Sequence, residues 1–257
     1  MAEVSAMNKV RIGVVGLGVM GAAHARNLLS GAVARCELAA VCHRDPARTG
    51  PFRPVRAFTT ADEMIRSGAV DAVLIATPHT SHASIAIAAL EQGLHVLVKK
   101  PIAVTKAEAL RMLAARRDPH QVFAAMFNVR TWPWWRRLRE LVASGELGDI
   151  YYVDAARLNL GLFQPDINVL WDLAPHDLSI LLYVLGLDPV EVSARGSSSV
   201  RPGIHDVAYM EVRFPGNVLA HMHFSWLDPC KVRRITIVGS KKMVVCNDLS
   251  ETEKIRI

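Results

Sequence analysis

Apolar and polar positions follow two different patterns along this chain of 257 residues. In the first half, short continuous apolar runs alternate with segments in which apolar residues recur at helical spacing. A short continuous apolar run predicts a strand buried on both faces, as in a parallel sheet. Strands are expected at 10–15, 37–42, 70–76, 94–98 and 122–127, and helices at 22–29, 60–67, 81–92 and 105–117. The alternation predicts an α/β fold with a doubly wound parallel sheet, and the Pro- and Arg-rich residues 50–58 predict a loop.

The pattern changes after Asn128, where strand-like segments follow one another. Helices are expected at 134–144 and at about 172–185, and strands at 150–158, 190–197, 206–214, 218–226, 233–238 and 241–246. Pro215, Gly216 and Asn217 supply a hairpin turn between two of these strands. A run of strands with a helix packed on it is an α+β layer. The sequence therefore predicts two domains, residues 1–128 and 129–257.

Composition narrows the class of protein. The chain is 51% hydrophobic and 21% charged, which is typical of a globular protein long enough for two modest domains. It has neither a bilayer-length apolar run nor the layout of a signal peptide, so a cytoplasmic protein without a membrane partner is expected. The four cysteines are scattered without metal-ligand spacing, which predicts free thiols and no metal site. The net charge of +6 is spread along the chain, which favours a phosphorylated small molecule over nucleic acid as the partner.

The glycine-rich stretch VRIGVVGLGVMG, residues 10–21, joins a predicted strand to a predicted helix. Gly16 permits a tight turn, Gly18 lets the backbone approach a pyrophosphate, and Gly21 lets the helix pack close to its strand. The free N–H groups at the helix start then face the phosphates. This context predicts a dinucleotide site, and the alternative is a glycine-rich turn in some other α/β protein.

The residues after the second predicted strand bear on the choice of cofactor. An enzyme that uses NAD usually places a carboxylate on the adenosine ribose about 20 residues beyond the glycines. This chain has His43 and Arg44 there, and Asp45 follows. Since arginine pairs with phosphate in a forked geometry, NADP is expected, with NAD as the alternative. Asp45 could still reach a ribose hydroxyl, or both basic side chains could point into solvent. The expected cofactor contacts are Gly16, Gly18, Val19, Met20, Gly21, His43, Arg44, Ala76, Thr77, Pro78, His82 and Lys100.

Three residues are candidates for chemistry. Asp172 and His176 are four positions apart, so they share one face of a predicted helix. A carboxylate one turn from an imidazole can orient it for proton abstraction near neutral pH. The alternative is that Asp172 caps the helix and His176 is a structural histidine. Lys100 follows a strand at the ligand-binding edge, where it can stabilise a developing negative oxygen, or it is a solvated lysine.

Five segments in this order resemble the Gfo/Idh/MocA oxidoreductases: Gly16–Gly21, Thr77–His82, Lys100–Pro101, Gly145–Gly148 and the Asp172/His176 helix. The resemblance implies a Rossmann domain that binds NAD or NADP and an open-faced sheet domain that supplies the substrate site. It also implies a homodimer or homotetramer formed through sheet faces. Lys100 would bind and polarise the substrate oxygen, His176 would be the general base, and Asp172 would be its partner or a second substrate contact. A cis peptide is implied at Lys100–Pro101.

Residues 157–177 and 225–234 resemble the branch of nucleotide-sugar and polysaccharide-pathway dehydrogenases, which oxidise a ring hydroxyl. The substrate contacts that this implies are Arg157, Asn159, Asn168, Asp172, His176, Lys231 and Arg233. Two features depart from the family. Lys99 stands where the family usually has Glu, and relatives usually continue past the equivalent of Ile257. The second departure predicts a sheet edge that is exposed or covered by a partner subunit.

The sequence thus predicts hydride transfer between a hydroxyl carbon of a sugar or nucleotide sugar and nicotinamide. A ketosugar or carbonyl reductase is the same chemistry run backwards. A catalytically weak dinucleotide-binding or regulatory protein is a third alternative, because of Lys99 and the short C-terminus. The tryptophans Trp132, Trp134 and Trp135 are expected to pack the two domains together or to form a subunit interface.

Overall fold

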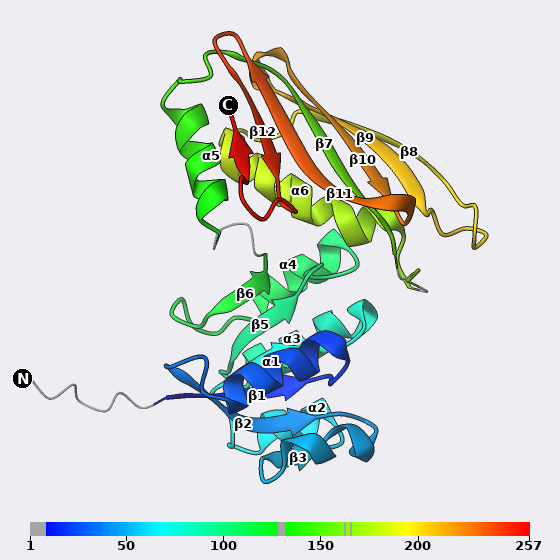
Figure 1. Cartoon of the computed structure of the whole chain (residues 1–257). Helices are drawn as coiled ribbons and strands as arrows, with labels where there is room; N and C mark the ends of the chain where they lie inside the picture. Colours follow the sequence, from blue (N-terminus) through cyan, green and yellow to red (C-terminus); the bar gives the residue numbers. More distant parts are fainter. Residues whose placement is uncertain (1–8, 128–131, 162, 165) are drawn as a thin grey trace, which may run out of the picture. The chain divides into compact units, whose positions relative to one another are not determined.

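The computed structural model describes residues 9–127, 132–161, 163–164 and 166–257 (Figure 1). It divides into two compact units, Met1–Met126 and Phe127–Ile257, which are described separately. The predicted boundary residue, Asn128, lies outside the described residues. The predicted domain limits therefore stay a prediction.

Within residues 9–126, six parallel strands form one sheet in the order β3-β2-β1-β4-β5-β6. The strands are β1 (Val10–Val15), β2 (Cys36–Cys42), β3 (Arg56–Phe58), β4 (Ala72–Ile75), β5 (His95–Lys99) and β6 (Phe123–Met126). The helices are α1 (Val19–Leu29), α2 (Ala61–Arg66), α3 (His82–Glu91) and α4 (Lys106–Ala114). Strand order reverses at β1 and β4, which is where open sheets of this kind bind ligands. The predicted doubly wound parallel sheet is confirmed.

Side chains of successive residues in the central strands are buried on opposite faces of this sheet. Val14 packs with Leu28 of α1 and Phe52, whereas Val15 packs with a second cluster that includes Met64 of α2 and Leu90 of α3. Because both faces are covered by helices, β1 and β4 are apolar at nearly every position.

One strand of this sheet lies where the sequence predicts a loop. Residues 56–58 form the edge strand β3, whose Ala57 pairs with Val41 of β2. The prediction was wrong because Arg56 and Ala57 are exposed, so the segment carries no apolar periodicity. Its strand character comes from backbone pairing alone.

In the described part of the second unit, seven strands form one sheet in the order β13-β12-β11-β7-β10-β9-β8. They are β7 (Ile150–Leu160), β8 (Glu191–Ser197), β9 (Val207–Phe214), β10 (Val218–Ser225), β11 (Leu227–Gly239), β12 (Met243–Asn247) and β13 (Ile255–Arg256). The central strand β7 runs parallel to β10 and antiparallel to β11. The helices α5 (Pro133–Ala143) and α6 (Val169–Leu185) lie on one face (Figure 1). The predicted α+β layer with an open-faced sheet is confirmed, although β13 was not predicted.

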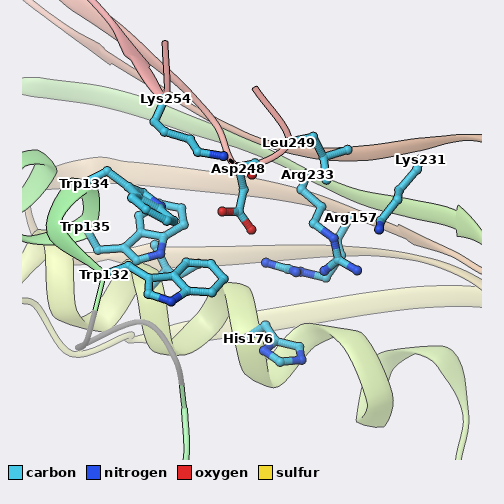
Figure 2. A pocket seen from close by; sticks show the side chains of 11 residues that line it. Trp132, Trp134, Trp135, Arg157, His176, Lys231, Arg233, Asp248, Leu249 and Lys254 are labelled. Carbon is cyan, nitrogen blue, oxygen red and sulfur yellow. Dashed lines mark hydrogen bonds between the residues drawn. The ribbon is translucent and has the colours of Figure 1, made fainter. Parts of the chain in front are cut away.

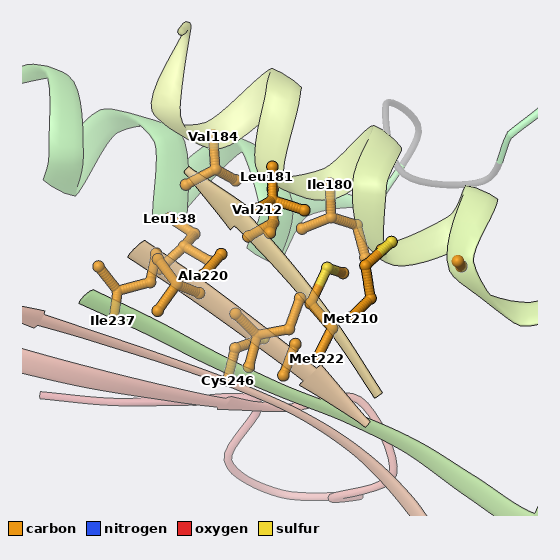
Figure 3. Close-up of a cluster of buried hydrophobic side chains, with 14 of the residues drawn as sticks. Leu138, Ile180, Leu181, Val184, Met210, Val212, Ala220, Met222, Ile237 and Cys246 are labelled. Carbon is orange, nitrogen blue, oxygen red and sulfur yellow. The ribbon is translucent and has the colours of Figure 1, made fainter. Parts of the chain in front are cut away.

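The core of this unit lies between the two helices and the sheet. Leu181 and Val184 of α6 face Val212 and Ala220 of the strands (Figure 3). Alternate positions of β9, such as Tyr209, lie on the other face and are exposed. None of the helices in the described ranges has the length and apolar character needed to cross a bilayer.

Candidate functional site

In the glycine turn after β1, two of the three glycines have no room for a side chain, and the third faces open space. Gly16 has a φ of 89°, and a Cβ there would lie 2.8 Å from the Ala76 carbonyl oxygen. A Cβ at Gly21 would lie 1.8 Å from the Gly16 carbonyl oxygen. A Cβ at Gly18 would meet nothing within 4 Å. The turn therefore packs tightly on α1 and the end of β4 and leaves open space at Gly18.

The start of α1 adjoins this open space. Gly18 is the N-cap, and no side chain caps the helix there. Its first turn holds no acidic residue, and Val19 is 85% exposed. Unpaired N–H groups at a helix start bind phosphate well. The residues present thus fit a dinucleotide pyrophosphate at Gly18, Val19 and Met20.

His82 joins the loops that follow β4 and β5. Its ring nitrogens lie 3.0 Å from the Pro101 carbonyl oxygen and 3.1 Å from the Thr77 carbonyl oxygen. The side chain has no exposed surface, and burial lowers the pKa of its imidazole. Because a fully buried ring cannot touch a ligand, the expected cofactor contact of His82 is replaced by a structural role. Thr77 accepts a hydrogen bond from the Ser81 hydroxyl at 2.8 Å and, with Ala76 and Pro78, remains at the sheet edge.

Asp45, the acidic residue of the loop after β2, stabilises the conformation of that loop. The Asp45 carboxylate accepts a hydrogen bond from the Ala47 N–H at 3.0 Å and caps a short 3₁₀ turn. The Asp45 N–H donates to Nδ1 of His43 at 3.0 Å. Arg44 is exposed. The carboxylate that could reach a ribose hydroxyl is therefore engaged in the loop, and a basic group is presented at the end of β2.

Lys100 is partly buried directly after β5, and its peptide bond to Pro101 is cis, as the resemblance implies. The charge of the preceding residue, Lys99, affects a histidine of α1. Burial and the charge of Lys99 together lower the pKa of His24, whose Nε2 atom is buried without a hydrogen-bond partner among the described residues. Lys99 therefore disfavours a charged imidazole at this position.

The helix α6 begins three residues earlier than predicted. Its N-cap is Asn168, whose side-chain oxygen accepts a hydrogen bond from the Trp171 N–H at 3.0 Å. The alternative in which Asp172 caps the helix is therefore wrong. Asp172 accepts a hydrogen bond from Nε1 of Trp226 at 3.1 Å, which fixes the carboxylate one turn before His176.

His176 lines a pocket of about 370 Å³ in the second unit (Figure 2). The pocket combines an aromatic wall with a cluster of basic side chains from β7, β11 and the end of the chain. The lining residues are Trp132, Trp134, Trp135, Arg157, His176, Ile180, Lys231, Arg233, Asp248, Leu249 and Lys254. The three tryptophans, expected at a domain junction or subunit interface, line this pocket.

Arg157 is held by a partner that the sequence argument missed. Its Nε donates to both carboxylate oxygens of Asp177 at 3.0 Å, and both residues are buried. Asp177 stands one residue after His176 in α6, and only the packing of α6 against β7 shows its role. Arg233 is partly buried beside this pair, and burial and the charge of Arg157 lower the pKa of its guanidinium.

The structure gathers some of the expected substrate contacts and not others. Arg157, His176, Lys231 and Arg233 line the pocket. Asn159 is not among its lining residues, and the Asn168 side chain is committed to capping α6. The described residues hold no group of three or more His, Cys, Asp or Glu arranged to bind a metal ion.

Comparison with known proteins agrees with this architecture. Residues 10–127 match the family model described as an oxidoreductase family with an NAD-binding Rossmann fold. Residues 135–245 match the GFO/IDH/MocA C-terminal domain.

Two curated relatives are 32% identical to this chain. They are a UDP-N-acetylglucosamine 3-dehydrogenase of Acidithiobacillus ferrooxidans, matched over 76% of this chain and 60% of its own length, and inositol 2-dehydrogenase 2 of Paenarthrobacter aurescens, matched over 79% and 65%. This chain thus spans less than two thirds of either relative. The crystal structure of GenD2 from gentamicin A biosynthesis in complex with NAD is 26% identical, with a TM-score of 0.84 over 96% of this chain and 75% of that one.

Proposed function

The chain belongs to the Gfo/Idh/MocA family of oxidoreductases, and we propose that it transfers a hydride between a hydroxyl-bearing carbon of a sugar or polyol and a nicotinamide dinucleotide. The observation that carries this proposal is the glycine turn, which is closed at Gly16 and Gly21 and open at Gly18. A turn of this shape beside an uncapped helix start is what a dinucleotide pyrophosphate requires. When bound, the nicotinamide supplies hydride acceptance and donation.

The protein's own residues handle the proton. His176 takes the hydroxyl proton as the carbon gives up its hydride, and Asp172, fixed by Trp226, orients and stabilises the imidazolium. Lys100 stabilises the negative charge that develops on the substrate oxygen. The same groups act in reverse for a ketosugar or carbonyl reductase, because a general base in one direction is the general acid in the other.

The test is turnover with a panel of inositols and nucleotide sugars, followed through nicotinamide absorbance. His176→Asn and Lys100→Met should each reduce kcat by about 10²-fold or more, and His176→Asn should leave cofactor affinity unchanged. The exposed His120→Asn and Lys106→Met are matched controls and should behave as wild type. Wild-type turnover in His176→Asn would overturn the assignment of the base.

The preferred cofactor in this proposal is NADP. The Asp45 carboxylate is engaged in its loop, while Arg44 is exposed at the end of β2. Calorimetry should give a dissociation constant for NADP about tenfold lower than for NAD, or ~1.4 kcal/mol. Arg44→Ala should remove most of this difference. Equal affinities, or tighter binding of NAD, would overturn the preference for NADP.

The presence of Lys99 supports one further candidate function, that of a dinucleotide-binding protein with weak catalysis. Lys99 stands where the family usually has a carboxylate, and its charge lowers the pKa of His24 in α1. Lys99→Glu should then raise turnover without a matching change in cofactor affinity. An unchanged or lower kcat in that variant would dismiss this candidate.

The uncovered face of the second sheet supports a homodimer or homotetramer. Tyr209 is 48% exposed there and stacks on His223 with ring centroids 4.3 Å apart. Aromatic groups on an open sheet face are suited to a symmetric interface. Sedimentation of the wild type and of Tyr209→Lys tests this, and a monomeric wild type would refute it.

A further inference from the structure

We propose that the pocket of the second unit binds an anionic group of the substrate, a phosphate or a carboxylate, with Arg233 as its main charged contact. The inference rests on the proposed function only in taking the ligand to be the substrate. It separates an anionic sugar, such as a nucleotide sugar, from a neutral polyol. The binding itself can be measured without turnover.

The balance of charge in the pocket favours an anion. Arg157, Lys231, Arg233 and Lys254 line it, and among the described residues Asp248 is the carboxylate that does so. Asp177 lies behind Arg157 and neutralises it through the buried pair. Positive charge therefore remains in excess in a partly enclosed site, where it acts more strongly than on an open surface.

Arg233 differs from Arg157 in the use of its donors. Arg157 donates through Nε and Nη2 to Asp177. The Arg233 guanidinium forms no hydrogen bond or ion pair with the described part of the chain, although burial already lowers its pKa. A guanidinium carries five N–H donors in a planar fork that matches phosphate and carboxylate oxygens. An anionic group would repay the cost of placing this charge in the pocket.

The aromatic wall holds a second unused donor. Nε1 of Trp134 is buried and has no hydrogen-bond partner among the described atoms. The Trp132 and Trp134 rings lie beside each other with centroids 4.7 Å apart, and the Lys254 ammonium lies 5.2 Å from the Trp134 ring centre. The pocket thus offers the donors of Arg233 and a flat apolar surface, a combination suited to a ligand with an anionic end and a ring.

Asp248 supplies an internal counter-charge. Its N–H donates to the Arg233 carbonyl oxygen at 2.9 Å, and the Lys254 ammonium donates to the Asp248 carbonyl oxygen at 2.8 Å. These backbone contacts leave the carboxylate pointing into the pocket, between Trp134 and Arg233 (Figure 2). Burial raises the pKa of Asp248, and the charges of Arg157, Arg233 and Lys254 oppose that effect. The carboxylate therefore occupies anion-binding space and weakens the site for a ligand.

The test uses the full chain without cofactor, titrated with UDP, glucuronate, inorganic phosphate and myo-inositol. Binding is read by tryptophan fluorescence, because three tryptophans line the pocket, and by calorimetry. The wild type should bind at least one anion, more weakly as salt rises, and should not bind myo-inositol. Preference for UDP or for glucuronate identifies the anion as phosphate or carboxylate. Absence of anion binding, or equal binding of myo-inositol, would overturn the proposal.

The variants are chosen to give opposite results. Arg233→Met should weaken anion binding about tenfold or more, which corresponds to ~1.4 kcal/mol. Asp248→Asn should strengthen it several-fold. The matched control is Arg234→Met, because Arg234 is exposed and lies 3.7 Å from Asp154 in an ion pair on the uncovered face. Equal losses in Arg233→Met and Arg234→Met, or weaker binding in Asp248→Asn, would overturn the role of Arg233.

The failure of this inference can be told apart from failure of the proposed function. Dinucleotide binding and turnover of a neutral polyol without anion binding would leave the function standing and the inference overturned. Anion binding that responds to Arg233→Met without any dinucleotide binding would do the opposite. Circular dichroism of each variant confirms that the fold is retained.

Discussion

Alanine substitutions at Gly18 and Gly21 should separate cofactor binding from folding. In Gly21→Ala, the added Cβ would lie 1.8 Å from the Gly16 carbonyl oxygen, about 1.2 Å short of the closest approach that Cβ atoms show. The atom it meets is backbone, so no side chain can rotate away. The start of α1 must move off the turn after β1, and that movement also disturbs the phosphate-binding N–H groups.

The size of the effect follows from this clash. Overpacking a close-packed site costs about 1–3 kcal/mol, and a clash with rigid backbone belongs at the upper end. Gly21→Ala should therefore lower the free energy of unfolding by about 3 kcal/mol and abolish tight cofactor binding. In Gly18→Ala the Cβ enters open space, so stability should stay within about 0.5 kcal/mol of wild type. Cofactor affinity should still fall at least tenfold, or ~1.4 kcal/mol, because the methyl group fills the space of the pyrophosphate.

The assay is urea unfolding combined with calorimetric titration of NADP and NAD. Gly50→Ala is the matched control, because a Cβ at Gly50 also meets nothing within 4 Å and its φ is not in the left-handed region. It should change neither quantity. Wild-type cofactor affinity in Gly18→Ala would refute the placement of the pyrophosphate. Wild-type stability in Gly21→Ala would refute the packing argument.

Three further predictions concern ionisable groups. Arg157→Met leaves Asp177 buried without its partner and should cost about 3–5 kcal/mol in urea unfolding. The double variant with Asp177→Leu should recover most of that loss, and an additive loss would contradict the pairing. Burial lowers the pKa of His82 below 6.5, so the unfolded chain binds the proton more readily. The contribution of His82 to stability is therefore present above pH 6.5 and lost as the pH falls below it; His82→Asn should flatten this acid-side decline, and an unchanged slope would contradict it. A thiol reagent at mildly alkaline pH should label exposed Cys230 and leave Cys246 intact, because burial raises the pKa of that thiol to about 12. Equal labelling rates, followed by mass spectrometry, would refute the burial argument.

Much of the fold could be predicted from the sequence because the two patterns are local. The apolar run ending at Val15 and the glycines after it specify strand, turn and helix within twelve residues. Thr60 and Glu63 likewise mark a helix start, and the structure shows their reciprocal capping box. Element ends were less predictable. Asn168 and Asp172 are both good N-cap residues, and only the hydrogen bond from the Trp171 N–H to the Asn168 side chain decides between them.

The pocket could not be predicted as a whole because its parts are far apart in the chain. Trp134 and Lys254 are separated by most of the second unit, and strand pairing and the packing of α5 on the sheet bring them together. Arg157 was expected to contact substrate because of the resemblance to the nucleotide-sugar branch, yet its partner Asp177 is twenty positions away and visible only in the fold. Motifs predicted which side chains carry chemistry, whereas the pairing and packing of distant elements decided which of them meet.

The position of β7 also governs the order in which the second unit can be built. This strand is made before α6, β8 and β9, yet its two sheet neighbours are β10 and β11, which come later in the chain. In the first unit, by contrast, the central strands pair with strands that lie closer in sequence. Pairing between distant segments is slow because a long loop must close first. As the chain leaves the ribosome, both edges of β7 therefore stay unpaired until β10 and β11 have been made, and an unpaired strand edge can pair with a wrong segment.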